Sequence, residues 1–158
     1  MARFMTRQGY DAILEEIEHL WAHERPAMVQ QVAEAAAHGD RSENAEYIYG
    51  KRRLGQIDSR MRYLNRKVQN VEVVDLDQQE PVDHVRFGAL VRVEDEDGAQ
   101  KQWRLVDKDE SDPNQGRISI QSPIGVALVN RRVGDVAEAH LPRGTVELEI
   151  LEIRYGAE

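Results

Sequence analysis

The chain has 158 residues, a formal net charge of −8 and no cysteine. This length suits one ordinary domain, or a small domain with an extension that packs mainly on itself. Without cysteine there is no disulfide, no thiolate metal site and no thiol nucleophile. The negative charge restricts any nucleic-acid binding to local patches. The first residues lack the apolar core of a signal peptide and no run could span a membrane, so we expect a cytoplasmic protein without a membrane partner.

The first predicted element is a helical segment that begins at Thr6, a suitable N-cap residue. Apolar residues then recur at helical spacing and are predicted to share one face: Tyr10, Ile13, Leu14, Ile17, Leu20 and Trp21. Pro26 removes a backbone hydrogen bond from a helix and clashes with the preceding turn. We therefore expect a kink or a short break between Glu24 and Pro26.

A second helical segment follows Gly39-Asp40 and extends to about Val71. Its apolar residues alternate steps of three and four, which is the spacing of a coiled-coil seam: Leu54, Ile57, Met61, Leu64 and Val68. Two such segments joined by a short connection predict an antiparallel helical hairpin. Each arm of about 30 residues would be roughly 45 Å long.

The two segments carry opposite charges. The first is rich in Asp and Glu, whereas the second carries a run of cations: Lys51, Arg52, Arg53, Arg60, Arg62, Arg66 and Lys67. A basic helix face in an acidic protein is typical of phosphate binding. Opposite charges on the arms of a hairpin also pair across its seam. The pattern leaves both interpretations open.

The connection between the segments, residues 39–47, contains two carboxylates three residues apart, Asp40 and Glu43. One interpretation is a capping box, with Asp40 as N-cap and Glu43 at N3 of the second helix. The other is a contribution to a Mg²⁺ site, which two carboxylates alone would bind weakly. The end of a hairpin has no walls to exclude water. It is better suited to carry carboxylates into the active site of another protein.

From about residue 80 the hydrophobic pattern alternates. Strands are predicted at 89–93 and 102–106 around an Asp97-Gly98 turn, then at 117–121, 136–141 and 145–154. Ser122-Pro123 predicts the start of a short helix. We therefore expect an α+β chain with a coiled-coil hairpin domain at 1–75 and an antiparallel β domain at 80–158.

The stretch Gly39-Asp40-Arg41-Ser42-Glu43-Asn44-Ala45-Glu46-Tyr47, followed by Lys51-Arg52-Arg53-Leu54, closely resembles the bacterial Gre transcript-cleavage factors. Arg41-Ser42 and the basic second segment are similar to the GreB type of that family. Ile118-Ser119-Ile120-Gln121-Ser122-Pro123 and Val133-Gly134-Asp135 are similar to its C-terminal domain. The resemblance covers essentially the whole chain.

The resemblance implies that the hairpin enters the secondary channel of RNA polymerase while an FKBP-like β domain docks on the channel rim. Asp40 and Glu43 would then help to hold the second catalytic Mg²⁺ of the polymerase and orient the attacking water. The polymerase itself would cleave the 3′ end of backtracked RNA. The protein would thus be an accessory factor, not an enzyme, with no cofactor of its own.

The resemblance also implies roles for other residues. Arg41, Lys51, Arg52, Arg53 and Arg60 would face the nascent RNA and the channel, and Ser122 with Pro123 would dock on the rim. Gln121 departs from the acidic residue common there in relatives. We expect a monomer. Two alternatives remain: a channel-binding regulator that does not stimulate cleavage, and a coiled-coil adaptor in which the two carboxylates are only a cap.

Overall fold

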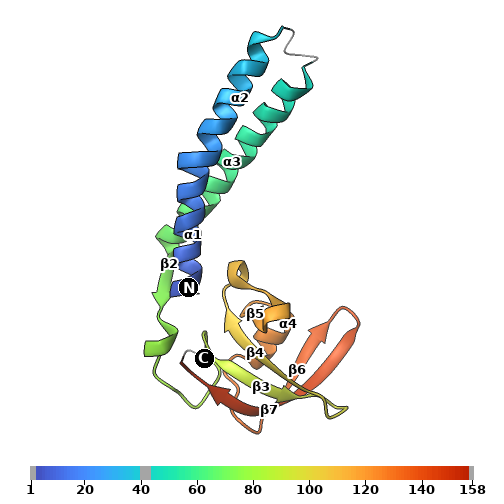
Figure 1. Ribbon diagram of the computed structural model, residues 1–158. Helices are drawn as coiled ribbons and strands as arrows, with labels where there is room; N and C mark the ends of the chain where they lie inside the picture. Colours follow the sequence, from blue (N-terminus) through green and yellow to red (C-terminus); the bar gives the residue numbers. More distant parts are fainter. Residues whose placement is uncertain (1–2, 40–43, 157–158) are drawn as a thin grey trace. The chain divides into compact units, whose positions relative to one another are not determined.

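The computed structural model of the protein describes residues 3–39 and 44–156. Figure 1 shows a long two-helix hairpin and a β sheet with a short helix. The residues described form two compact units, one of them Tyr10–Asn70 and the other made by the residues before Tyr10 and after Asn70. No helix among the described residues is long and apolar enough to cross a membrane.

The first arm is a continuous helix made of three parts: α1 (Arg7–His19), a π-helical turn (Leu20–Glu24) and α2 (Arg25–Ala37). The Gly9 backbone N–H donates to the Thr6 hydroxyl oxygen at 3.2 Å, which confirms Thr6 as the N-cap. His19 and Arg25, on either side of the π turn, keep right-handed helical backbone angles. The disruption predicted near Pro26 is therefore a π turn just before the proline, not a break.

The spacing of the seam residues explains the π turn. Ile13, Leu20 and Ala35 are buried and Met28 is half-buried, so the inward positions follow steps of seven, eight and seven residues. A heptad seam tolerates the extra residue if one turn of the helix is widened, which a π turn does. The Arg25 N–H accordingly bonds to the carbonyl of Leu20, five residues back.

One part of the predicted apolar face is wrong. Leu14 is 43% exposed and Trp21 is 60% exposed, although both were expected on the buried face. Each follows a buried residue, Ile13 or Leu20, by one position, and one step along an α-helix rotates a side chain by about 100°. Leu14 and Trp21 therefore face outward.

The second arm is one helix of 26 residues, α3 (Ala45–Asn70). It lies beside α2, antiparallel to it. Ile57 and Leu64 of the predicted seam are buried at 0% and 1% exposure. Gly50 is buried where the arms approach closely, because a Cβ there would lie 2.5 Å from Cγ2 of Val32. The coiled-coil hairpin predicted from the sequence is confirmed.

Two short strands were not predicted. β1 (Arg3–Thr6) pairs in parallel with β2 (Val71–Val74), which continues directly from α3. Four residues are too few to display a reliable alternation, and parallel partners far apart in the chain leave no local signal. A 3₁₀ turn (Leu76–Gln78) follows β2.

The remaining strands form a five-stranded sheet in the order β5-β4-β3-β7-β6. Its elements are β3 (Leu90–Glu94), β4 (Gln100–Val106), β5 (Arg117–Ser119), α4 (Pro123–Leu128), β6 (Val136–Leu141) and β7 (Gly144–Arg154). All neighbours are antiparallel except β4 and β5, which are parallel. Two 3₁₀ turns, Lys108–Glu110 and Pro113–Gln115, connect that pair. The predicted, mostly antiparallel β domain with a short helix is thus confirmed.

The core beneath this sheet is made of inward residues of the strands, of α4 and of the segment before β3: Val85, Ala89, Val91, Val93, Leu105, Ile118, Leu128, Ala137, Ala139, Leu148 and Ile150. In β7 the alternation is direct, since Leu148 and Ile150 are buried while Glu147 and Glu149 are exposed. Gly98 has a φ of 82° in the turn between β3 and β4, a backbone conformation that glycine adopts without strain. The predicted Asp97-Gly98 hairpin is confirmed.

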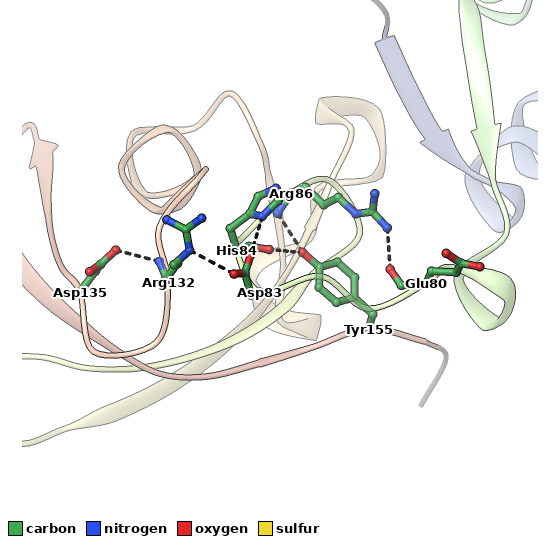
Figure 2. A network of polar contacts seen from close by, with 7 residues as sticks. All are labelled: Glu80, Asp83, His84, Arg86, Arg132, Asp135 and Tyr155. Atoms are coloured by element: carbon green, nitrogen blue, oxygen red, sulfur yellow. Dashed lines mark hydrogen bonds and ion pairs between the residues drawn. The ribbon is translucent and has the colours of Figure 1, made fainter.

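A polar network, drawn in Figure 2, fixes residues 80–86, which precede β3. The Tyr155 hydroxyl donates to the carbonyl oxygen of His84 at 2.5 Å and accepts the Arg86 backbone N–H at 3.0 Å. Burial raises the pKa of Tyr155. Hydrogen bonds from His84 and Arg132 lower the pKa of the exposed Asp83 carboxyl. Tyr155 is therefore the half-buried anchor of this network and Asp83 its solvated edge.

Replacing Tyr155 by phenylalanine is expected to lower the free energy of unfolding by about 1–2 kcal/mol, because two backbone groups lose their partner. The raised pKa means that the wild-type contribution is fully present below about pH 10, the pKa of an unperturbed tyrosine, and is lost as the pH rises through the folded-state value. Urea unfolding at pH 7 and at pH 11 measures both effects. The exposed Tyr49→Phe is the control, and an equal loss of stability in both variants would contradict the anchor role.

Candidate functional site at the end of the hairpin

The predicted metal-assisting pair, Asp40 and Glu43, and the predicted RNA-binding Arg41 lie outside the described residues, which end at Gly39 and resume at Asn44. The structure does describe both ends of the connection. α2 ends at Ala37, and the His38 N–H donates to the Ala35 carbonyl oxygen at 3.2 Å. Gly39 has a φ of 129°, which favours glycine at the end of a helix.

Asn44, for which the sequence pattern predicts no role, fixes the base of this connection. Its Oδ1 accepts the Tyr47 backbone N–H at 3.2 Å, so Asn44 is the N-cap of α3. Its Nδ2 donates to the Ala35 carbonyl oxygen at 2.7 Å, near the end of α2. One side chain therefore joins the ends of both arms. The sequence signal for this role is an asparagine directly before a helix-forming run, whereas the capping-box interpretation places the N-cap at Asp40.

The position of this cap decides against one earlier interpretation. The second helix begins at Ala45 with Asn44 as its N-cap, so Asp40 is not the N-cap of α3 and Glu43 is not at its N3 position. The capping box is wrong. Capping of this helix therefore gives no reason for a pair of carboxylates at 40 and 43.

Ion pairs between described residues join the two arms: Arg25 with Asp58, Arg53 with Glu24, and Arg60 with Glu16. The Arg53 Nε donates to Glu24 at 2.7 Å, and the Arg60 guanidinium donates twice to Glu16, at 2.7 and 3.0 Å. These arginines are half-buried or partly exposed along the seam. Pairing across the hairpin is thus the observed arrangement of Arg53 and Arg60, which the resemblance had assigned to RNA.

Lys51 and Arg52 are different. Both are exposed in the second turn of α3, and neither forms an ion pair with a residue in the described part of the chain. Ion pairs of exposed side chains contribute little to stability, so the lack of such a pair with a described residue does not weaken the hairpin. The predicted basic set therefore divides into seam cations and outward cations, with Arg41 outside the described residues.

The predicted docking residues lie at the start of α4. Ser122 is its N-cap: the hydroxyl oxygen accepts the Gly125 N–H at 3.1 Å and the hydroxyl donates to the Ser119 carbonyl oxygen at 2.6 Å. Pro123 and Gln121 are exposed. Val126, one turn further on, is 64% exposed. Ser122 thus shapes the turn, while Pro123 and Val126 present an apolar surface.

The donor atoms near the tip decide whether a metal ion could be held there. Among residues 3–39 and 44–156, no group of three or more His, Asp or Glu side chains is placed to hold a metal ion. The side-chain amide of Asn44 is hydrogen-bonded through both its oxygen and its nitrogen. Two carboxylates fit the oxygen preference of Mg²⁺ but supply only part of its six ligands. The donor set fits a metal whose other ligands come from a partner.

The described residues thus define a protein with an α-helical hairpin, whose arms Asn44 joins near the tip, and a β unit. Comparisons with known proteins assign this combination to a family. Residues 3–73 match the family model "Transcription elongation factor, N-terminal" and residues 78–155 match "Transcription elongation factor, GreA/GreB, C-term". The chain belongs to the GreA/GreB family of transcription elongation factors.

Similar proteins span almost the full length of the chain. It is 47% identical to the transcription elongation factor GreB of Yersinia pestis over 154 residues, covering 98% of this chain and 90% of the relative. It is 44% identical to the GreB of Haemophilus influenzae, covering 98% and 97%. The crystal structure of Gfh1 from Thermus thermophilus aligns with a TM-score of 0.44 at 22% identity, covering 98% and 99%.

Proposed function

We propose that the protein stimulates cleavage of the 3′ end of backtracked nascent RNA by inserting its hairpin into the secondary channel of RNA polymerase. The observation that carries this proposal is the Asn44 bridge between the arms. It holds the ends of a connection that contains the two carboxylates, and Asn44 rather than Asp40 is the N-cap of α3. The polymerase performs the hydrolysis, and the protein is an accessory factor that works in the cytoplasm.

Asp40 and Glu43 would each contribute carboxylate oxygens to an incomplete site in the polymerase. A second Mg²⁺ held there by the two carboxylates and the polymerase would lower the pKa of the attacking water and offset the charge of the phosphodiester. The two side chains also orient that water through hydrogen bonds, and the channel supplies the walls that the hairpin lacks. Because Asn44 joins the described ends of the two arms, the arms need not rearrange relative to each other when the carboxylates engage.

The cations have two roles in this proposal. Arg53 and Arg60 stiffen the hairpin by pairing with the first arm. Lys51 and Arg52, which point outward near the tip, hold the phosphates of the extruded RNA together with Arg41.

On the β unit, the turn at Ser122 and Pro123 docks on the rim of the channel. The chain acts as a monomer, because one hairpin fills one channel.

Replacing Arg52 by glutamate is expected to slow cleavage of long-backtracked complexes by about tenfold and to reduce its salt dependence, because a phosphate contact is lost. Folding is expected to remain unchanged, since Arg52 has no ion pair among the residues described. Cleavage rates between 50 and 200 mM salt, with thermal unfolding of the free protein, give the two readouts.

The matched control for this prediction is Arg53→Glu, which places a carboxylate beside Glu24. Its main effect is expected on stability, a loss of about 1 kcal/mol. If Arg52→Glu lowers stability as much as Arg53→Glu and leaves the salt dependence unaltered, the division into outward and seam cations is wrong.

A transcript-cleavage assay tests the proposed function. A stalled, backtracked polymerase complex with 3′-labelled RNA receives Mg²⁺ and the full-length protein, and released 3′ fragments are followed over time. Rapid release that depends on the protein supports the proposal. Binding to the polymerase without stimulated release would instead favour the alternative, a channel-binding regulator.

A further inference from the structure

The outer face of the first arm carries an apolar stripe that the hairpin does not use. We define this stripe as Leu14, Trp21, Pro26, Val29 and Ala33, all of which are exposed. Trp21 is 60% exposed, Val29 44% and Leu14 43%. A tryptophan this exposed on a helix leaves a large apolar surface in water, which usually marks a contact with another molecule.

The π turn keeps this stripe on one face. Leu14 and Trp21 are seven residues apart, which is close to two α-helical turns. From Trp21 to Val29 the step is eight residues, and one α turn of 3.6 residues plus one π turn of about 4.4 also makes eight. The widened turn that preserves the buried seam therefore preserves an outward apolar line as well.

Trp21, Pro26, Val29 and Ala33 border a shallow hollow, together with Arg25 and Gln30. The ring of Trp21 and the face of Pro26 are rigid, so little side-chain entropy would be lost on contact. Arg25 is held by Asp58 of the other arm through a 2.9 Å contact, which leaves the hollow without a free cation. Its surface suits an apolar side chain rather than a phosphate.

The charges around the stripe identify the kind of partner. Between Tyr10 and His38, Arg25 is the single Lys or Arg, and it is paired with Asp58. Four acidic residues of this arm are exposed: Asp11, Glu15, Glu18 and Glu34. RNA would be repelled by this face, and so would the same face of a second copy. The surface is complementary to an apolar groove bordered by Lys and Arg on another protein.

We propose that the apolar stripe is a docking surface for a protein groove of this kind on RNA polymerase, separate from the carboxylates and the outward cations. The stripe would contribute to the affinity for the polymerase and fix the rotation of the hairpin about its long axis. Asp40 and Glu43 would take part in the RNA cleavage reaction itself. This inference rests on the proposed function, because it takes the polymerase as the partner.

The test uses the full-length double variant Trp21→Ser/Val29→Ser. Its Kd for the stalled polymerase complex is expected to rise by about tenfold or more, since aromatic anchors dominate such contacts. The cleavage rate at saturating protein is expected to stay within twofold of wild type. Gln31→Ser, an exposed position of the same helix outside the stripe, is the control. An unchanged Kd for the double variant would overturn the proposal.

A second measurement distinguishes docking of the stripe on a protein from binding to RNA and from self-association. A photoreactive benzoylphenylalanine at position 21 is expected to cross-link to a polymerase subunit, and cross-linking to RNA would overturn the inference. Sedimentation of the free wild-type protein that showed a dimer, lost in the double variant, would assign the stripe to a second copy and overturn it as well. Absence of stimulated cleavage by wild type, with the cross-link to the polymerase retained, would refute the proposed function but not the docking surface.

Discussion

Exchanging Asp40 for asparagine is expected to lower stimulated transcript cleavage by about a hundredfold or more while leaving polymerase affinity within twofold. The change keeps the shape of the side chain but removes its charge, and neutral amide oxygens are weaker Mg²⁺ ligands than carboxylates. Glu43→Gln is expected to act in the same direction. Single-turnover cleavage of a backtracked complex, measured at saturating protein, gives the rate.

The control for these variants is Glu46→Gln, which removes an exposed carboxylate from the first turn of α3. Its cleavage rate is expected to stay within about threefold of wild type. Because Asn44 caps α3, the helix content and the unfolding midpoint of Asp40→Asn should match those of wild type. Full activity of Asp40→Asn, or an equal loss in Glu46→Gln, would contradict a specific role for the pair.

Two glycines of the same helix are expected to respond to alanine with opposite signs. Glycine inside a helix is less stable than alanine by about 0.5–1 kcal/mol, so Gly55→Ala should stabilise the hairpin by roughly that amount. Nothing lies within 4 Å of a Cβ at Gly55. At Gly50 the new Cβ would lie 2.5 Å from Cγ2 of Val32, so Gly50→Ala should destabilise it by about 1–3 kcal/mol.

Urea unfolding followed by helical circular dichroism checks both signs in one experiment. Valine has one strongly preferred rotamer in a helix, so Val32 cannot easily turn away from the new methyl group. Gly50→Ala combined with Val32→Ala should recover part of the lost stability, because the second change removes the opposing Cγ atoms. Stabilisation by Gly50→Ala alone would show that the arms do not approach as closely as the structure has them.

Much of the fold could be predicted from the sequence because its patterns are long. The seam of α3 runs from Leu54 to Val68 with little interruption, and β7 alternates over most of its length. The turn at Gly98 and the cap at Ser122 are local signals that the structure confirms. In each case several residues agree on one period, or a single residue type meets a specific backbone need.

What could not be predicted depends on contacts between distant residues. The pairing of β1 with β2 joins Arg3 to Val71, and no local pattern reports it. The π turn was anticipated only as a disruption near Pro26, because its form follows from the register of the opposite arm. Asn44 was missed for the same reason, since half of its role is a bond to the Ala35 carbonyl on the other helix.

The most direct test of the carboxylate mechanism is the Mg²⁺ dependence of cleavage. The rate of 3′ fragment release from a backtracked complex is measured across a Mg²⁺ titration, with wild type, with Asp40→Asn and without the protein. If Asp40 and Glu43 complete a metal site of the polymerase, wild type lowers the Mg²⁺ concentration for half-maximal rate and Asp40→Asn does not. Equal half-maximal concentrations for wild type, the variant and the polymerase alone would contradict that mechanism.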